Sequence, residues 1–376
     1  MNNKTKDIVQ TILIGLFVFV FAFWCWLKPE IDYSKTERRV LDKLPELSFS
    51  SISDGDFMSE FEGYTTDQFP MRDSFRTIKA ITAYYFYNFL DNNDVYLHSN
   101  VIGKLEYPLK DDQFVSASKK FKYLYDTYMK DNNTTVYLSV IPDKNAFMAE
   151  EAGRLVMDYN KAVDLMKNNC TFAEYIDIYP LLSINDYYNT DTHWRQEKIT
   201  DVAEKLAESM GASLVSDYTE NTLDKDFYGV YYGQAALSVE PDTIKYLTND
   251  IIDGCVLYSY DYKGDLIESK MYDINKADGN DPYDLFLLGS SQSIIKVVNP
   301  NATTEKELVV FRDSFGSSLV PLLASGYKTI TVIDTRYVSS LQLGFFMNEG
   351  ILDSFDNKDI LFIYSTLVLN NSGQLK

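Results

Sequence analysis

The sequence predicts a three-layer α/β domain, in which helices cover both faces of a mostly parallel sheet, preceded by an N-terminal transmembrane helix. The first observation is the final third of the chain, where apolar β-rich runs alternate with helical patterns. Such alternation is typical of parallel strands joined by helices that pack on the sheet. The second observation is an uncharged apolar run from Ile8 to Leu27, which has about the 20 residues that a helix needs to cross a bilayer.

The apolar run is predicted to be an uncleaved membrane anchor. A cleavable signal ends in small residues, whereas this run ends in bulky side chains at 23–27. Basic residues on its two sides do not decide the orientation, but long domains translocate largely regardless of such charges. We therefore expect a cytoplasmic tail at 1–7, an anchor at 8–28 and a single-pass cell-membrane protein whose large domain is extracellular.

Residues 29–95 are predicted to form a juxtamembrane stalk and a helical segment. The part at 29–50 is polar and of mixed charge, which indicates a solvated tether. Apolar residues at 56–89 follow a helical spacing that is interrupted by Pro70. Because proline lacks an N–H group and clashes with the preceding turn, we expect two helices here. The α/β domain then occupies 96–376.

Helical and strand patterns alternate through much of this domain. The pattern predicts helices at 112–130, 158–167, 196–210, 315–325 and 339–347, and strands at 134–141, 171–178, 307–311, 328–333 and 359–365. Residues 212–283 follow neither period clearly, and we expect loops and hairpins inserted in the domain. Ligand sites of open α/β sheets collect at the carboxyl ends of the strands, so the loops after 141, 311 and 333 are the informative ones.

Composition excludes several classes of function. The chain has 376 residues, of which 45% are hydrophobic, so it can bury a substantial core. Its net charge of −20 argues against nucleic acid or an anionic lipid surface as the main partner. With two histidines and three cysteines, the chain offers no pattern of metal ligands, and we expect neither a metal nor a cofactor. A neutral or weakly charged substrate fits better.

Asp191, His193 and Ser314 are the candidate catalytic residues. If the segment at 191–194 is extended, Asp191 and His193 point the same way, and the carboxylate can hold the imidazole in one tautomer. Ser314 follows an apolar strand pattern at its carboxyl end, and a serine needs such a base to become a nucleophile. Two structural alternatives stand beside this: Ser314 as a helix N-cap and His193 as a buried structural histidine.

The neighbouring loops supply further candidates. Lys144 follows the strand pattern at 134–141, and Arg336 and Tyr337 follow the one at 328–333. We expect these side chains to bind substrate or to assist the oxyanion. The amide of Ser314 at a helix start is the expected first oxyanion donor.

Several motifs together resemble a known family. The segments 187–194, 311–315 and 332–337 are similar to the DHHW family of Gram-positive surface proteins, and the likeness extends to 34–41, 56–72 and 364–371. That family is similar to the alginate O-acetylation proteins, whose SGNH-hydrolase-like domains carry an Asp-x-His motif upstream of the serine. Thr192 stands at the second position of the family motif, as in the alginate-type pattern. Leu288, Gly289 and Ser290 stand where related sequences often have Gly-Asn.

The resemblance implies an SGNH-like Ser-His-Asp O-acetyltransferase or acetylesterase that acts on a cell-surface polysaccharide. By matching position, Ser314 would be the nucleophile, His193 the base and Asp191 its orienting partner, with Gly289 or Ser290 as candidate oxyanion donors. A transferase outside the cell has no acetyl-CoA, so the resemblance also implies a membrane-bound O-acyltransferase as partner. The alternatives are a non-catalytic carbohydrate-binding or scaffold protein of a polysaccharide-modification complex, and a metal-dependent hydrolase, which the scarcity of histidine disfavours.

Overall fold

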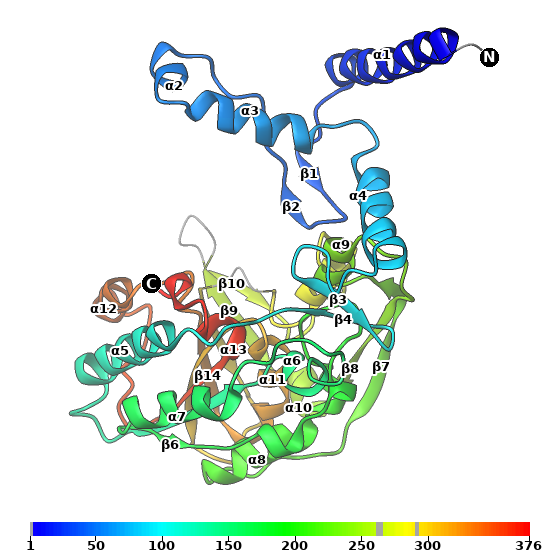
Figure 1. Cartoon of the computed structure of the whole chain (residues 1–376). Coiled ribbons are helices and arrows are strands. Elements are labelled where there is room, and N and C mark those ends of the chain that lie inside the picture. The colour runs from blue at the N-terminus through cyan, green and yellow to red at the C-terminus, as the bar shows by residue number, and fades with distance from the viewer. Residues whose placement is uncertain (1–2, 261–265, 290–292) are drawn as a thin grey trace. The chain divides into compact units, whose positions relative to one another are not determined.

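The computed structural model describes residues 3–260, 266–289 and 293–376, in two compact units (Figure 1). The first unit contains the residues up to Asn93 together with Tyr232–Ser238. The second unit contains Asp94–Tyr231 and Val239–Lys376. The candidate catalytic residues and the whole of the main sheet therefore belong to the second unit.

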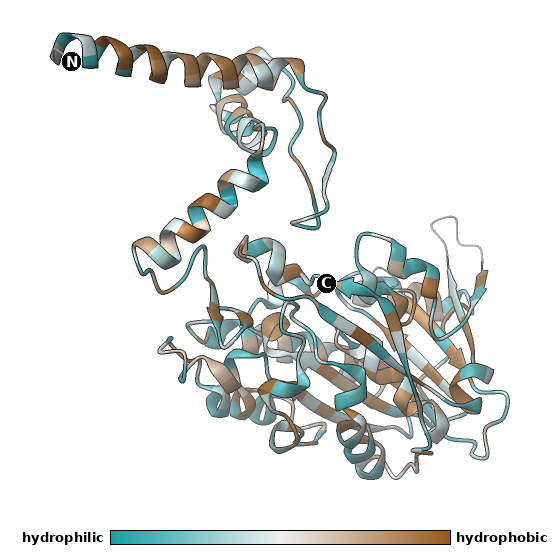
Figure 2. Ribbon diagram, turned by 90° about the vertical axis from the view of Figure 1, so that its right-hand side faces the viewer, coloured by the Kyte–Doolittle hydropathy of each residue, from teal (hydrophilic) through white to brown (hydrophobic). Residues whose placement is uncertain are grey.

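The first unit begins with α1 (Asn3–Leu27), and the stretch from Lys4 to Leu27 is long and apolar enough to cross a membrane. Figure 2 shows it as hydrophobic along nearly its whole length. The elements that follow are the hairpin β1 (Tyr33–Ser34) and β2 (Arg39–Val40), then α2 (Phe49–Ser53), α3 (Asp56–Asp67), α4 (Arg72–Ile81) and a π-helical turn at Thr82–Phe86. The predicted break at Pro70 is confirmed, because α3 ends before it and α4 begins after it.

The segment at 29–50 differs from the solvated tether that its composition predicts. Arg39 on the hairpin donates a hydrogen bond of 2.7 Å to Asp67 at the end of α3. The side chain of Gln68 bonds to both the N–H group and the carbonyl of Ile31. The segment therefore contacts the end of α3 through Arg39 and Ile31, which composition does not reveal, while most of residues 42–50 is exposed as predicted.

Among the described residues of the second unit, eight strands form one mixed sheet in the order β10-β9-β11-β13-β12-β14-β5-β6. The strands are β5 (Thr135–Ile141), β6 (Glu174–Tyr175), β9 (Val256–Tyr260), β10 (Leu266–Ser269), β11 (Ile294–Val298), β12 (Glu307–Arg312), β13 (Thr329–Ile333) and β14 (Asp359–Ser365). Pairing from β13 to β6 is parallel, whereas β11, β9 and β10 add an antiparallel edge. The strands predicted at 307–311 and 328–333 are confirmed as β12 and β13, and they pair in parallel with each other.

Helices cover both faces of this sheet, as predicted. Val310 on β12 packs in the same apolar cluster as Leu206 of α8, while its neighbour Val309 packs in another cluster with Phe121 of α5. This alternation is what period-two side chains on a strand produce. The helices of this unit are α5 (Asp111–Tyr128), α6 (Asn145–Met148), α7 (Tyr159–Asn169), α8 (Thr200–Ser209), α10 (Asp250–Gly254), α11 (Gly316–Leu323), α12 (Ser340–Asn348) and α13 (Thr366–Leu369). The first two residues of α9 (Val230–Ala235) also belong to it, and the others belong to the first unit.

Two hairpins accompany the sheet. They are β3 (Val95–His98) with β4 (Val101–Lys104), and β7 (Thr219–Phe227) with β8 (Asp242–Thr248). The second confirms that 212–283 contains hairpins, but β9 and β10 of the same region join the main sheet. Of the strand predicted at 171–178, only β6 (Glu174–Tyr175) forms a strand.

Candidate active site

The segment that carries Asp191 and His193 is a turn, not the extended strand assumed from sequence. A β-bridge between Tyr187 and Trp194 closes a loop over the intervening residues. Inside it, the backbone N–H of His193 donates to Asp191 Oδ1 over 3.1 Å. This side-chain-to-backbone bond is the geometry of an Asx-turn, and it brings the two side chains together by a different route.

Ser314 lies on the turn between β12 and α11, at the carboxyl end of the parallel part of the sheet. Asp313 fixes this turn, because its buried carboxylate accepts hydrogen bonds from the N–H group of Phe315 at 3.1 Å and from the N–H group of Ser365 at 2.7 Å. The residues on both sides of Ser314 are buried, while Ser314 itself is partly exposed. A substrate could therefore reach its hydroxyl.

The three predicted residues form one connected chain of hydrogen bonds. His193 Nε2 lies 2.8 Å from Ser314 Oγ, and His193 Nδ1 lies 2.6 Å from Asp191 Oδ1. Asp191 is fully buried and His193 nearly so. The first distance is that of a nucleophile hydrogen-bonded to its base, and the second is that of a base hydrogen-bonded to the group that orients it.

Asp191 is held by backbone at the start of α9. Its Oδ2 accepts a hydrogen bond of 2.8 Å from the N–H group of Val230. The preceding residue is Gly229, where a Cβ atom would lie 2.3 Å from Asp191 Cβ and 2.4 Å from Asp191 Cα. A glycine is therefore required here because the two backbone segments pass too closely for a side chain.

The residue before Asp191 is anchored to the hairpin β7–β8. Thr190 donates from its N–H group and its hydroxyl to Asp242 Oδ2, at 2.7 Å and 2.6 Å. The Thr190 hydroxyl in turn accepts from the N–H group of Gly229 at 2.9 Å. Asp242 thus ties the Asp191 turn to the inserted hairpin.

Aromatic side chains fix the imidazole of His193. Tyr283 stacks on it with ring centroids 4.1 Å apart and an interplanar angle of 7°, and donates its hydroxyl to Ser318 at 2.8 Å. Burial raises the pKa of the Tyr283 hydroxyl, which keeps it neutral beside the imidazole. Trp194 donates from its indole to the carbonyl of Phe315 and to the Ser318 hydroxyl, each at 3.0 Å. The base and the nucleophile turn are therefore bound to each other through α11.

The other predicted site residues lie in less direct positions. Arg336 follows β13, and both carboxylate oxygens of Asp334 accept from its guanidinium, which also lies over the ring of Tyr337 at 5.5 Å. Gly289 has a left-handed φ of +87°, and its N–H group donates to the carbonyl of Phe286 at 3.0 Å. That hydrogen is committed to the loop. Ser290 lies outside the described residues.

Lys144 is buried behind the Asp191 turn and is 2% exposed. Its ammonium donates to the carbonyls of Ile102 and Asn189, at 2.8 Å and 3.2 Å, and lies 5.2 Å from the ring centroid of Tyr231. Burial lowers the pKa of Lys144 to about 7, against the opposite influence of nearby carboxylates, Asp191 first. The geometry gives Lys144 a supporting position under the turn that carries the candidate triad.

Sequence reasoning missed several supporting residues. Gly229, Asp242 and Tyr283 lie in the stretch without clear periodicity, and only their contacts across the chain reveal them. Arg312 is also missed: it is fully buried at the end of β12, donates to the carbonyl of Asp313 at 3.2 Å and lies 3.4 Å from Asp334. The one sequence signal for Arg312 is its position, because it is a charged residue at the end of an apolar strand pattern.

Solved structures of other proteins have the same fold as this chain. No protein-family model matches the sequence, and no curated protein does. A DHHW family protein from Eubacterium siraeum matches in structure with a TM-score of 0.60 and 20% identity, over 76% of this chain and 94% of that one. Bacillus cereus PatB1 matches with a TM-score of 0.59 and 18% identity, over 74% of this chain and 97% of its own. This chain has the fold of these proteins.

A second structure of PatB1, which carries a sulfonyl adduct, matches with a TM-score of 0.57 and 18% identity, over 73% of this chain and 95% of that one. The resemblance to the DHHW family that the motifs indicate is thus confirmed at the level of the fold. So is the predicted α/β architecture with a mostly parallel sheet.

Proposed function

We propose that this protein is an extracytoplasmic serine O-acetyltransferase or acetylesterase that acts on a cell-surface polysaccharide. The observation that carries the proposal is the chain of contacts from Ser314 through His193 to Asp191, at 2.8 Å and 2.6 Å. A serine, an imidazole and a buried carboxylate in this order are the parts of a nucleophilic acyl-transfer site. The resemblance to the DHHW and alginate O-acetylation proteins supports the acetyl group and the polysaccharide.

The first half of the reaction forms an acetyl-enzyme. Ser314 Oγ attacks the acetyl carbonyl while His193 Nε2 takes its proton, and Asp191 stabilises the imidazolium through Nδ1. The tetrahedral intermediate collapses when the C–O bond to the donor breaks, and His193 returns the proton to the leaving oxygen. Among the described hydrogen bonds of this turn, the backbone N–H group of Ser314 donates to no other group. It is therefore free to donate to the developing oxyanion.

The second half transfers the acetyl group to an acceptor hydroxyl. A sugar hydroxyl or a water gives its proton to His193 and attacks the acetyl carbonyl, and the C–O bond to Ser314 breaks as Oγ regains a proton. A sugar acceptor makes the enzyme a transferase, and water makes it an esterase. As a transferase it would receive acetyl groups from a membrane-bound O-acyltransferase, because acetyl-CoA is absent outside the cell.

The proposed location rests on the length and apolar composition of α1. We assign this apolar helix as an uncleaved single-pass anchor, with the short N-terminal tail in the cytoplasm and the α/β unit outside the cell. An anchored enzyme would act on polymer that is close to the membrane.

The test compares the full chain with Ser314→Ala in para-nitrophenyl acetate hydrolysis. We expect loss of the acetyl-enzyme burst in Ser314→Ala and full activity in the matched control Ser209→Ala, at the end of α8. A sulfonyl fluoride should modify the wild-type chain at Ser314 alone. Equal hydrolysis by a folded Ser314→Ala variant would instead favour the non-catalytic scaffold.

A further inference from the structure

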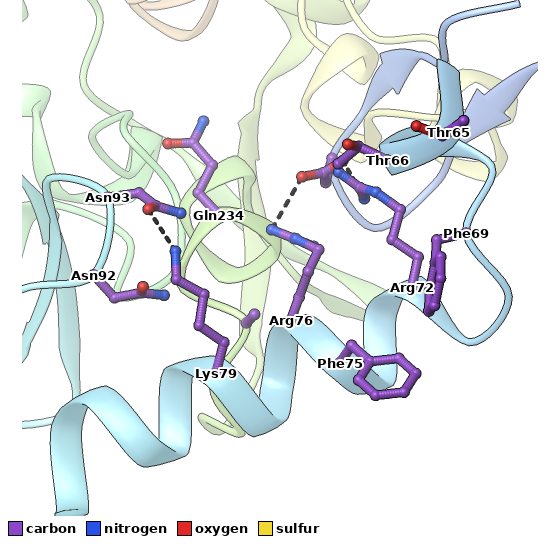
Figure 3. Close-up of a pocket in the computed structure, with 12 residues that line it drawn as sticks. Thr65, Thr66, Phe69, Arg72, Phe75, Arg76, Lys79, Asn92, Asn93 and Gln234 are labelled. Carbon is purple, nitrogen blue, oxygen red and sulfur yellow. Dashed lines mark hydrogen bonds and ion pairs between the residues drawn. The ribbon is translucent and has the colours of Figure 1, made fainter. Parts of the chain in front are cut away.

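A basic cavity lies within the first unit, apart from the candidate triad. Its volume is about 640 Å³, and one wall is the side of α4 that carries Arg72, Arg76 and Lys79 (Figure 3). Residues three and four apart on a helix share a face, so these three cations point to the same space. The amides of Asn92 and Gln234 also line it.

The two guanidinium groups are already organised around a carboxylate. Glu37 Oε2 accepts from Arg72 Nη1 at 2.6 Å, and Glu37 Oε1 lies 3.1 Å from Arg76 Nη2, so the carboxylate bridges the two arginines. The nearby Asp67 and Asp73 lie farther from them, at 3.4 Å from Arg72 and 3.6 Å from Arg76. The cavity therefore has an internal anion where a ligand's anion could bind.

Lys79 lacks such a partner. Its ammonium donates to the side-chain oxygen of Asn93 at 2.8 Å, and no carboxylate within the described ranges pairs with it. Asn92, which also lines the cavity, is only 6% exposed. An ammonium without a carboxylate partner and a nearly buried amide thus line a basic cavity, in a chain whose net charge is −20.

The apolar wall of the cavity touches the proposed anchor. Phe69 and Phe75 line the cavity, and both pack against Phe21 of α1, with ring centroids 5.4 Å and 5.6 Å away. Phe21 lies six residues before the end of α1 at Leu27, which is about 9 Å along a helix. Trp24 and Trp26 follow it, and tryptophan is enriched at the membrane interface. If α1 crosses the membrane as proposed, the cavity lies near the lipid head groups.

We infer that this cavity binds the phosphate of an anionic membrane lipid. Arginine forks and an ammonium suit phosphate oxygens, and the amides of Asn92 and Gln234 suit the hydroxyl groups of a glycerol head. The acidic character of the chain as a whole excludes a general attraction to anionic membranes, so recognition depends on this local set of cations. A free phosphate ester shares the same chemistry, and the test below separates the two sources.

The experiment titrates the full chain, in a neutral detergent, with dihexanoyl phosphatidylglycerol, dihexanoyl phosphatidylcholine and glycerol 3-phosphate, and measures heat of binding. Phosphatidylglycerol should bind most tightly. Lys79→Gln should weaken its binding about fivefold, the effect of one charge near a lipid head group. Glu37→Gln should tighten it by a similar factor because the competing carboxylate is removed. Lys122→Gln on α5 is the control and should change nothing.

The opposite sign expected for Glu37→Gln separates a binding role from damage to the fold, which cannot tighten binding. Unchanged affinity in both Lys79→Gln and Glu37→Gln, or equal losses in Lys79→Gln and Lys122→Gln, would overturn the inference. Equal affinity for glycerol 3-phosphate and phosphatidylglycerol would overturn the assignment to a lipid and leave a soluble phosphate ester as the ligand. Each of these outcomes is independent of Ser314, so it does not bear on the proposed acetyl transfer.

Discussion

Replacing Gly229 by alanine should disable the candidate triad without touching any of its three side chains. The added Cβ would lie 2.3 Å from Asp191 Cβ, 2.4 Å from Asp191 Cα and 2.4 Å from the carbonyl oxygen of Thr190. Ordinary contact of this kind begins at 3.4 Å. Because all three atoms belong to or adjoin the backbone, no side-chain rotation can relieve the overlap.

The expected loss of activity follows from the displacement of Asp191. Asp191 must move by about 1 Å, which stretches its bond to His193 Nδ1 from 2.6 Å to roughly 3.6 Å, beyond hydrogen-bond range. A misplacement of about 1 Å in a catalytic array lowers the rate on the order of 100-fold. Overpacking should also lower the free energy of unfolding by about 1–3 kcal/mol.

The assay measures the rate at which a sulfonyl fluoride captures Ser314, followed by intact mass, together with para-nitrophenyl acetate hydrolysis. Sulfonylation reports activation of the serine and needs no natural substrate. Gly373→Ala is the matched control, since no atom lies within 4 Å of its added Cβ. Urea unfolding establishes that Gly229→Ala remains folded under the assay conditions.

Wild-type sulfonylation and hydrolysis rates in a folded Gly229→Ala variant would refute this reasoning. Such a result would mean either that Asp191 can move without loss of activity or that it does not orient His193. A loss of both rates in Gly373→Ala as well would show that glycine replacement acts through the fold in general.

Three further predictions concern charged groups of the second unit. Asp191→Asn should lower kcat of para-nitrophenyl acetate hydrolysis about 10⁴-fold because the amide favours the wrong imidazole tautomer, and a change below tenfold would contradict the assigned role. Lys144→Met should lower the free energy of urea unfolding by about 2–4 kcal/mol, since the buried carbonyls of Ile102 and Asn189 lose their donor; an unchanged midpoint would argue against this support. Burial raises the pKa of Glu106 from 4.5 to about 7, so the folded state binds a proton that the unfolded state releases between these values. The wild type should therefore lose about 1–2 kcal/mol of stability as pH rises through this window, after allowance for solvent screening. Glu106→Gln should lack this slope when urea unfolding is compared at pH 5 and pH 8, and parallel slopes would contradict the prediction.

Sequence patterns predicted the parallel half of the sheet well and the antiparallel half poorly. The strand at 307–311 and its neighbours carry long apolar runs between helical patterns, which local periodicity identifies. The strands at 256–260 and 266–269 are short strands of the antiparallel part of the sheet, and the pairing of the first with β11 depends on contacts far along the chain. Local pattern therefore left them among the hairpins.

The candidate triad was predicted in its members but not in its local geometry. Asp191 and His193 were paired on the assumption of an extended strand, whereas they meet across an Asx-turn. The turn depends on Asp242, Gly229 and Tyr283, which lie more than thirty positions downstream in the chain. The local sequence pattern around position 191 cannot predict these partners, because they come close to it only in the folded chain.

The indole of Trp194 joins the loop that carries the base to the first turn of the helix that follows the nucleophile. The loop that carries His193 and the turn that carries Ser314 are thereby hydrogen-bonded to each other inside the main core. Heating should accordingly extinguish turnover and core packing at a single temperature, and a covalent adduct on the serine should shift that temperature for the whole unit.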